Sequence, residues 1–427
     1  MKNIIIYILL IFLSHNSFAF QKLFQTDEKA KKFGKTITEK DLKKHLFIYA
    51  SDEFEGRDTG ARGQKMAVNY LVNFYKEIGI KAGNTNGSYV QEMTLDIRRD
   101  NVGQVETENV LAIIEGNEKP NEFVILTAHL DHVGKKGDVI YNGADDDGSG
   151  TVALLEIAEA FKKAVEKGRG PKRSILFLHV TGEEKGLLGS KYYSENPIYP
   201  LENTVVNLNV DMIGRIDPTR EKKNREYVYI IGSDHDSQDL HNLSEQTNAE
   251  TINIELDYRF NDTDDPNRFY YRSDHYNFAK NGIPIIFYFT GTHEDYHQPT
   301  DTPDKIEYDL LELRTQLIFY TAWNIANRDK RIIVDPKPEK KVYNIKKDDM
   351  DSYLGTYSAK NFPLKFIFKN NNGNLNIDIA GQGSFDLEAV ERHQFKLQEA
   401  SVELEFSPSE NKLKFKQGPY EVFLKKE

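Results

Sequence analysis

The chain has 427 residues, and 39% of them are hydrophobic, so it is long enough for two or three domains with buried cores. Acidic residues outnumber basic ones by 67 to 56, which gives a formal net charge of −11 at pH 7. This balance argues against a nucleic-acid-binding protein, whose surface needs a basic surplus. Cysteine is absent, so disulfides and lipidated cysteines are excluded, and any metal site must use nitrogen and oxygen ligands.

The amino terminus has the pattern of an export signal. Lys2 precedes an apolar run at 4–13, and Ser17 and Ala19 are the small residues of a cleavage site. The run is short for a transmembrane helix, and no second long apolar run follows it. We expect a signal peptide over residues 1–19 and a periplasmic or extracellular mature protein without a stable membrane anchor or a nucleic-acid partner.

Strand and helix patterns alternate along the chain up to residue 327. Helices are expected where apolar residues recur at helical spacing, and strands where short runs of apolar and β-branched residues occur. The expected helices are 64–78, 148–163, 237–248, 273–281 and 308–327. The expected strands are 88–95, 109–115, 122–128, 174–180, 204–210, 227–231 and 283–289. This alternation predicts an α/β fold with a mixed, mostly parallel central sheet flanked by helices on both faces.

A polar, glycine-containing loop ends the segment 41–63, after a short expected helix. Its residues Glu55 and Arg57 flank Gly56, and opposite charges at this spacing favour a local ion pair. We therefore expect local ion pairing to hold the loop, rather than a functional role for these residues.

The pattern changes near the carboxyl terminus. Residues 329–348 are charged and contain two prolines, so they are expected to form a linker. Beyond them, 402–406 and 412–416 alternate strictly between apolar and polar residues, and Asn372-Gly373 is a hairpin signal. We expect a first domain at 20–328 and a small antiparallel β domain at 349–427.

The expected strand 122–128 runs into a stretch rich in histidine, aspartate and glycine that ends at Gly150. Such an arrangement is typical of a site at the carboxyl edge of a sheet. His129 and Asp131 are two residues apart on an extended segment, so their side chains share a face. Asp131 is therefore well placed to orient His129, as a carboxylate does for a metal-bound imidazole.

Three consecutive aspartates, Asp145, Asp146 and Asp147, follow in the same stretch. Ionised carboxylates resist burial without partners, so a solvated turn or a calcium loop remain open interpretations. However, Ser149 lies near the start of an expected helix, whose amino end favours negative charge. One carboxylate turned inward could then bridge two cations.

Later loops supply further metal-binding side chains. Glu183 and Glu184 follow the strand 174–180, and because adjacent side chains diverge, one can bind metal while the other moves a proton. Asp211 ends an apolar strand, where an unpaired carboxylate would be costly, and His297 lies in a proline-bearing loop. The combined candidates are two histidines and three carboxylates: His129, Asp146, Glu184, Asp211 and His297. Sharing one carboxylate gives each of two zinc ions three protein ligands, and manganese and cobalt are weaker options.

Five motifs occur in order along the chain: HLD at His129, GADDDGSG at Gly143, GEEKGLLGS at Gly182, NVDMIG at Asn209 and YHQPTDT at Tyr296. On these motifs the chain resembles the co-catalytic zinc aminopeptidase family, which also contains aminopeptidase Y, glutamate carboxypeptidase and glutaminyl cyclase. The resemblance covers residues 41–327. It implies a zinc-exopeptidase-like fold, two zinc ions per chain and the hydrolysis of amino-terminal residues from peptides by a metal-bridged water.

The resemblance also implies a role for each matching residue. It makes the five candidates above the zinc ligands, with Asp146, rather than its neighbours, bridging the two ions. It makes Glu183 the general base and Asp131 the residue that orients His129. Tyr296 matches a position that helps to stabilise the tetrahedral intermediate in some members.

Other residues are expected around the substrate. The segment RSDHYNF, which contains Arg272 and Asp274, resembles bacterial members and is expected to shape the substrate pocket, with Asp274 or His275 having a structural role. Three aromatic residues are candidates for an apolar pocket, although aromatic residues at strand ends more often belong to the core: Phe260, Tyr288 and Phe289.

The chain departs from the family in two places. Many secreted members carry a protease-associated domain before the catalytic strands, and here only residues 98–108 stand in that place. The carboxy-terminal β domain is not a standard part of the family.

Three alternative functions remain open. A carboxypeptidase or dipeptidase of the same superfamily would need cations for the substrate carboxylate, for which the candidates are Arg259, Arg268 and Arg272. Glutaminyl cyclisation is less favoured. His129 completes a second zinc site here, whereas the cyclases resemble family members that have lost this site. A metal-bearing binding protein without activity is disfavoured because all five ligands are present.

Overall fold

The computed structural model describes residues 26–97, 102–220, 225–337, 343–379, 383–397, 400–418 and 420–427. The expected signal peptide at 1–19 lies outside these residues. Within the described ranges, no helix combines the length and the apolar character that spanning a bilayer requires.

The first domain is built around one mixed sheet. Its strands are β1 (Lys81–Ala82), β2 (Val90–Ile97), β3 (Gly103–Ile114), β4 (Lys119–His129), β7 (Arg173–Val180), β8 (Thr204–Val210), β9 (Tyr227–Ile231), β10 (Glu255–Asp257) and β11 (Ile285–Phe289). Their order is β1-β3-β7-β4-β8-β11-β9-β10, with β2 paired to β3. The central strands β7, β4, β8 and β11 run parallel, whereas β3 and β9 flank them in the antiparallel sense. The predicted mixed sheet with a parallel centre is confirmed.

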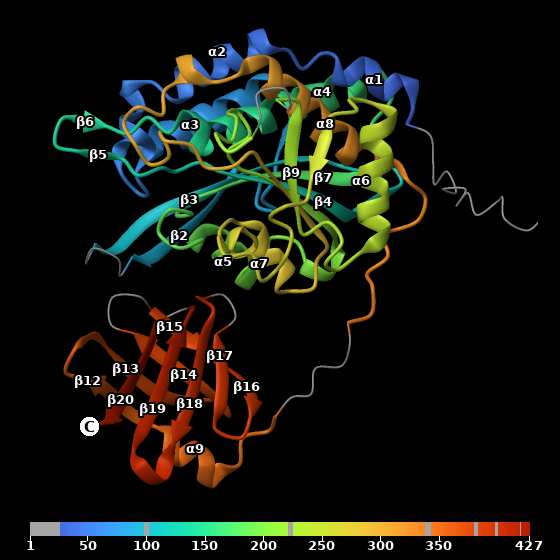
Figure 1. Ribbon diagram of the computed structural model, residues 1–427. Helices are drawn as coiled ribbons and strands as arrows, with labels where there is room; N and C mark the ends of the chain where they lie inside the picture. The colour runs from blue at the N-terminus through green and yellow to red at the C-terminus, as the bar shows by residue number, and fades with distance from the viewer. Residues whose placement is uncertain are drawn as a thin grey trace, which may run out of the picture.

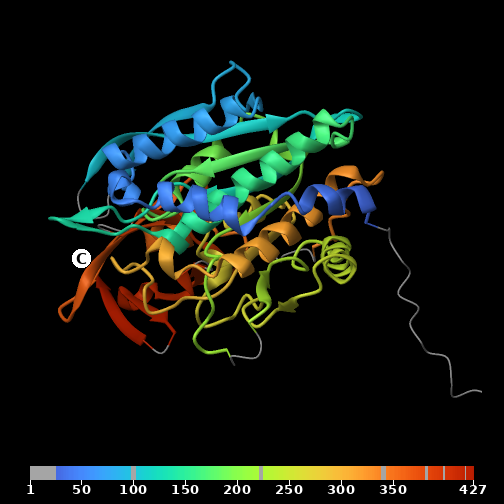
Figure 2. The same cartoon turned by 90° about the horizontal axis from the view of Figure 1, so that it is seen from above.

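Helices cover both faces of this sheet. They are α1 (Glu28–Gly34), α2 (Glu39–Tyr49), α3 (Arg62–Glu77), α4 (Gly150–Glu166), α5 (Leu188–Glu195), α6 (Gln238–Glu250), α7 (His275–Ala279) and α8 (Tyr308–Asn327). Figure 1 shows α5 and α7 below the sheet and the larger group above it, and the view in Figure 2 looks onto that upper group.

Strand β4 shows why two layers form. Val124, Leu126 and Ala128 join the core shared with α1–α4, α6 and α8, whereas Phe123 and Ile125 join the core shared with α5 and α7. Successive side chains of a strand point to opposite faces, so a strand that is apolar throughout needs cover on both sides.

The bounds expected for β8, β9 and α8 match those observed. Helices α1 and α5 were not among the expected helices. Leu187 precedes α5 with φ +58°, a left-handed conformation that side-chain periodicity does not reveal.

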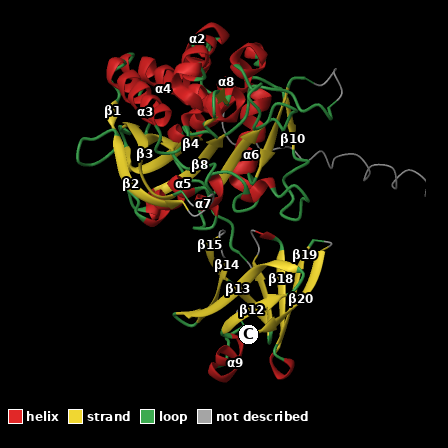
Figure 3. Cartoon of the chain, turned by 90° about the vertical axis from the view of Figure 1, so that its left-hand side faces the viewer, coloured by secondary structure: helices red, strands yellow, loops and turns green. Residues whose placement is uncertain are grey.

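The carboxy-terminal domain is an antiparallel, nearly closed sheet preceded by helix α9 (Lys347–Tyr353). Its strands are β12 (Gly355–Ala359), β13 (Phe362–Asn371), β14 (Asn374–Ile379), β15 (Gly383–Asp386), β16 (Glu388–Glu391), β17 (Gln394–Leu397), β18 (Val402–Ser407), β19 (Lys412–Gln417) and β20 (Tyr420–Lys426). The order runs from β15 to β16, and the two ends meet at Leu387, whose amide donates to the Leu375 carbonyl oxygen at 2.8 Å. Its aromatic core, which includes Phe366 and Phe406, is separate from the core of the first domain. The predicted second domain is therefore confirmed as a separate β body (Figure 3).

Candidate metal centre and substrate pocket

The predicted site residues converge at the carboxyl ends of the central parallel strands. His129 is the last residue of β4, Glu184 follows β7, Asp211 follows β8, and His297 lies in the loop after β11. Asp146 comes from the turn that leads into α4. Parallel strands end at one edge of the sheet, so loops far apart in sequence meet there.

One cluster consists of His129, Asp146 and Asp211, which we call the first cluster. The His129 Nε2 atom lies 3.1 Å from Asp146 Oδ1 and 3.6 Å from Asp211 Oδ1. These contacts lack hydrogen-bond alignment, and Nε2 has no hydrogen-bond partner among the described residues. Three buried donor atoms that face one another in this way suit a cation placed between them.

The second cluster shares Asp146 and adds Glu184, His297 and His132. The His297 Nε2 atom lies 3.0 Å from both Asp146 Oδ2 and Glu184 Oε1. The His132 Nδ1 atom lies 3.0 Å from Glu184 Oε1 and 3.8 Å from Asp146 Oδ2. Asp146 thus directs one oxygen to each cluster, the arrangement expected of a bridging carboxylate.

His132 was not among the predicted site residues. It lies three positions after His129, and on an extended strand this spacing would point the two side chains to opposite faces. However, β4 ends at His129, and the chain turns so that the His132 amide donates to the Arg57 carbonyl oxygen at 3.2 Å. A second histidine within the same short motif was the available signal.

The geometry and charge of these clusters fit divalent ions. A tetrahedral zinc ion with bonds of ~2.0–2.1 Å has ligand atoms about 3.3 Å apart, close to the contacts given above. Although burial alone lowers it, the pKa of His297 is raised to about 10 by the carboxylates of Asp146 and Glu184. The site therefore demands positive charge, which a cation bound to neutral imidazoles supplies.

Asp131 is fully buried and holds the loop that carries Glu183. Its Oδ2 accepts a hydrogen bond from the Thr59 hydroxyl at 2.8 Å, and its Oδ1 accepts one from the Glu183 amide at 3.1 Å. The nearest acceptor to His129 Nδ1 is the main-chain oxygen of Asp131 at 3.0 Å, whereas the carboxylate is 3.9 Å away. Asp131 thus contacts the histidine through its backbone and Glu183 through its carboxylate.

The three consecutive aspartates have different surroundings, and all are buried, which excludes a solvated turn. Asp147 accepts hydrogen bonds from the amides of His129, Gly150 and Met212. Asp145 accepts from the Gly214 amide and contacts His293. Of the three, Asp146 alone takes part in the two clusters.

The local ion pair expected between Glu55 and Arg57 is not the contact that holds the glycine loop. Arg57 is buried, and its guanidinium donates to the carbonyl oxygens of Asn142 at 2.7 Å, Gly143 at 2.8 Å and Tyr49 at 3.2 Å. Glu55 pairs instead with Arg62 and Lys135. Arg57 therefore secures the chain directly before Asp146, because a buried guanidinium must direct its donors to acceptors.

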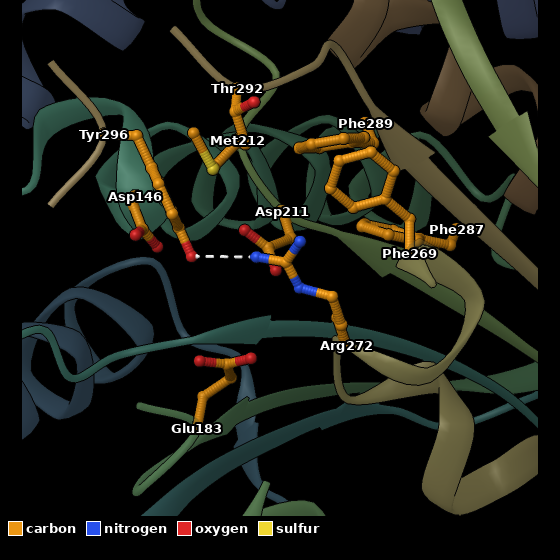
Figure 4. Close-up of a pocket in the computed structure, with 10 residues that line it drawn as sticks. All are labelled: Asp146, Glu183, Asp211, Met212, Phe269, Arg272, Phe287, Phe289, Thr292 and Tyr296. Atoms are coloured by element: carbon orange, nitrogen blue, oxygen red, sulfur yellow. Dashed lines mark hydrogen bonds between the residues drawn. The ribbon is translucent and has the colours of Figure 1, made fainter. Parts of the chain in front are cut away.

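A pocket opens beside the first cluster (Figure 4). Asp146, Glu183 and Asp211 line one side, and the carboxylate of Glu183 turns toward the other two. Three phenylalanine rings line the opposite side, Phe269, Phe287 and Phe289, and Met212 lies between them and Asp146. The pocket therefore combines a negatively charged edge with an apolar wall.

Of the aromatic residues expected in an apolar pocket, Phe289 lines this one. Tyr288 belongs instead to the core on the other face of the sheet, as aromatic residues at strand ends more often do, and Phe260 packs against Phe269 outside the pocket lining. Adjacent strand residues alternate between faces, so Phe289 and Tyr288 cannot both face the pocket.

Arg272 and Tyr296 complete the lining, and the Arg272 Nη2 atom donates to the Tyr296 hydroxyl oxygen at 3.4 Å. The other two candidate arginines lie outside the lining. Arg259 pairs with acidic residues and Arg268 stacks on an aromatic ring.

Asp274 and His275 are buried and lie outside the pocket lining. Burial raises the pKa of Asp274 to about 7. Burial also lowers the pKa of His275 to about 3, and its Nε2 atom lies 2.8 Å from the Tyr270 carbonyl oxygen. The preceding residue, Ser273, donates to Asp211 Oδ2 at 2.7 Å. This segment therefore contacts the site through Ser273, while Arg272 lines the pocket.

Comparison with known families matches residues 109–322, half of the chain, to the family described as "Peptidase family M28". The chain belongs to peptidase family M28. The matched region contains the strands, helices and loops that supply both clusters. The resemblance drawn from the five motifs is thus confirmed.

Two curated relatives and one solved structure illustrate the similarity. A "Probable zinc metalloprotease" of Pyrenophora teres f. teres (strain 0-1) is 26% identical over 315 residues, covering 63% of this chain and 62% of the relative. "Aminopeptidase YwaD" of Bacillus subtilis (strain 168) is 29% identical over 254 residues, covering 57% and 49%. The chain thus spans less than two thirds of either relative. The structure of LapB from Legionella pneumophila matches with a TM-score of 0.56 at 18% identity, covering 72% of this chain and 77% of that one, which shows a shared fold.

Proposed function

We propose that this M28 member is an exported two-zinc aminopeptidase that hydrolyses amino-terminal residues from peptides. One observation carries the proposal: Asp146 directs one oxygen to each of two metal-binding clusters, at the edge of a pocket that also contains Glu183. The proposed zinc ligands are His129, Asp146, Glu184, Asp211 and His297. When bound, two such ions lower the pKa of a water molecule and polarise the scissile carbonyl group.

Glu183 is the proposed general base. It accepts a proton from the attacking water and passes it to the nitrogen of the leaving amine. The bond from its amide to Asp131 fixes the backbone, and its carboxylate faces the pocket. Burial raises the pKa of the Glu183 carboxyl group, which favours proton acceptance, while nearby cations act in the opposite sense.

Tyr296 is the proposed hydrogen-bond donor to the oxyanion that forms during attack. Burial raises its pKa, so the hydroxyl stays protonated. Arg272 donates to the hydroxyl oxygen, which leaves the phenolic hydrogen available for the substrate.

The lining of the pocket suits a substrate residue with an apolar side chain. The wall formed by Phe269, Phe287 and Phe289 suits the side chain of the residue to be removed.

A panel of aminoacyl reporter substrates, assayed with and without a zinc chelator, tests this proposal. Leucyl and phenylalanyl reporters should be hydrolysed faster than aspartyl and glutamyl reporters, and the chelator should abolish turnover. Glu183→Gln should lower kcat by roughly 10²–10⁴-fold while the protein still holds its metal. A Glu183→Gln variant with near wild-type kcat would show that the base is another residue.

The second candidate is a dipeptidase or carboxypeptidase, which Arg272 favours as a cation within the pocket. Amino-blocked and carboxyl-blocked peptides discriminate the two, because an aminopeptidase cleaves only the carboxyl-blocked set. Glutaminyl cyclisation is disfavoured, since the His129 cluster is complete. Metal content without hydrolysis of any substrate would instead support a binding protein.

Export and the domain boundaries belong to the same proposal. Residues 1–19 are the proposed signal peptide, 20–328 the catalytic domain, 329–348 the linker and 349–427 the β domain. The intact mass of the protein recovered after secretion should correspond to a chain that begins at Phe20.

A further inference from the structure

We infer that His132 is an additional metal ligand, so that the second cluster surrounds its ion with four protein donors while the first cluster supplies three. The inference rests on the two-metal centre proposed above and adds a residue to it. The four donors are His132 Nδ1, His297 Nε2, Asp146 Oδ2 and Glu184 Oε1.

The distances between these atoms support a common ion. His297 Nε2 lies 3.0 Å from each carboxylate oxygen, and His132 Nδ1 lies 3.0 Å and 3.8 Å from the same two oxygens. Tetrahedral zinc with ~2.0–2.1 Å bonds places its ligand atoms about 3.3 Å apart. The two imidazoles approach with their ring planes at 73°, so they converge from different directions.

The state of the His132 ring is unusual for a buried histidine. The residue is fully buried, and neither ring nitrogen has a hydrogen-bond partner among the described residues. By contrast, buried His179 contacts the Tyr75 hydroxyl, and His275 contacts the Tyr270 carbonyl. A buried imidazole without such a bond costs free energy, and a metal bond to Nδ1 removes that cost for the nitrogen that faces the carboxylates.

The ring is also held in place before any ion binds. The His132 amide is bonded to the Arg57 carbonyl oxygen, and the ring packs directly on Gly143, where an added Cβ would lie 2.5 Å from two ring carbons. Gly143 has φ +57°, which a glycine adopts without strain. A ring fixed in this way pays little entropy on binding a metal.

The consequence is an asymmetric centre. Four protein donors close a tetrahedral site, as in structural zinc sites, whereas three donors leave a position open, as in catalytic ones. The pocket lining includes Asp211 of the first cluster but none of His132, Glu184 or His297. We therefore expect the second cluster to hold its ion more tightly and the first cluster to present the open position to the substrate.

Metal titration of the full-length mature protein tests this inference. A competing chelator, with zinc counted by elemental analysis, should reveal one tight and one weak ion in the wild type. His132→Ala should lower the zinc affinity of the tight site by at least about 10-fold. Removing a group that only hydrogen-bonds to a metal ligand already costs ~10–100-fold in affinity. His132→Asp, which keeps a donor, should recover part of that affinity. His45→Gln, at a histidine remote from both clusters, should change neither zinc affinity. Cobalt absorption at one equivalent should change in His132→Ala because a nitrogen donor is lost.

The outcomes separate the inference from the proposed function. A wild type that binds two ions and hydrolyses peptides, with His132→Ala retaining the same two affinities and the same cobalt spectrum, would overturn the inference alone. A wild type that binds no metal would overturn both. Circular dichroism of the metal-free variants checks that each one folds, and His132→Asp serves as the test should His132→Ala fail to fold.

Discussion

Replacing Arg57 with methionine should destabilise the first domain and disturb the metal centre together. The guanidinium is buried and donates to three carbonyl oxygens, of Tyr49, Asn142 and Gly143. The last two precede Asp146 by only a few residues. Methionine fills part of the space but offers no donor, so the Tyr49 and Asn142 oxygens lose the guanidinium as a partner, whereas the Gly143 oxygen keeps the Gly148 amide.

The magnitude follows from these contacts. Each buried acceptor left without a partner costs ~1–3 kcal/mol. If water reaches some of them, the total loss is about 3–5 kcal/mol in the free energy of unfolding. For a domain of about 300 residues, with an unfolding entropy of ~2.1 cal/mol/K per residue, that lowers Tm by roughly 5–8 °C. Because Asp146 bridges both clusters, zinc affinity should fall in the same variant.

The assay can be restricted to the first domain. Trp323 is the single tryptophan of the chain. It lies on α8 and packs in the core of the first domain, so its fluorescence during urea unfolding reports on that domain. Arg57→Lys keeps the charge but cannot reach three acceptors, and should lie between wild type and Arg57→Met. Arg62→Ala, at an exposed arginine, is the matched control. If Arg57→Met unfolds within 1 kcal/mol of wild type and binds zinc normally, the reasoning is refuted.

Further predictions concern catalysis, pH and metal. Thr59→Val removes the hydroxyl that donates to Asp131, whose carboxylate positions the backbone of Glu183. This variant should lower kcat about 10-fold, equivalent to ~1.4 kcal/mol, with little change in KM. An unchanged kcat would argue against this positioning role. Burial raises the pKa of Glu156 from 4.5 to about 8. The folded protein therefore keeps a proton that the unfolded chain has lost, and the free energy of unfolding falls as pH rises between these values. Glu156→Gln should flatten this slope and stabilise the protein at pH 9 by about 1–3 kcal/mol, whereas the partly exposed Glu159→Gln should not. Removing zinc should lower Tm, since free metal at 100 times its dissociation constant contributes ~2.7 kcal/mol; equal melting curves with and without chelator would contradict this.

Local patterns predicted much of the fold. The apolar run 122–128 produced the central strand β4, and the bounds of β8, β9 and α8 followed from residue type alone. Several short elements escaped prediction, among them the helices α1 and α5. α1 has only seven residues, and α5 begins after the left-handed Leu187, so neither had enough periodicity for recognition.

The sequence by itself determined the α/β class and the separate β domain, and it nominated the five candidate ligands, because carboxylates and histidines recur together in loops that follow its buried strands. Tertiary structure decided what each candidate contacts. It brought His132 next to Glu184, and it directed the Arg57 guanidinium to the chain just before Asp146. It also placed Phe289 rather than Tyr288 in the pocket. These contacts join residues that are distant in sequence, or depend on how the chain turns where a strand ends. Periodicity describes one element at a time, so it carries no information about which loops meet.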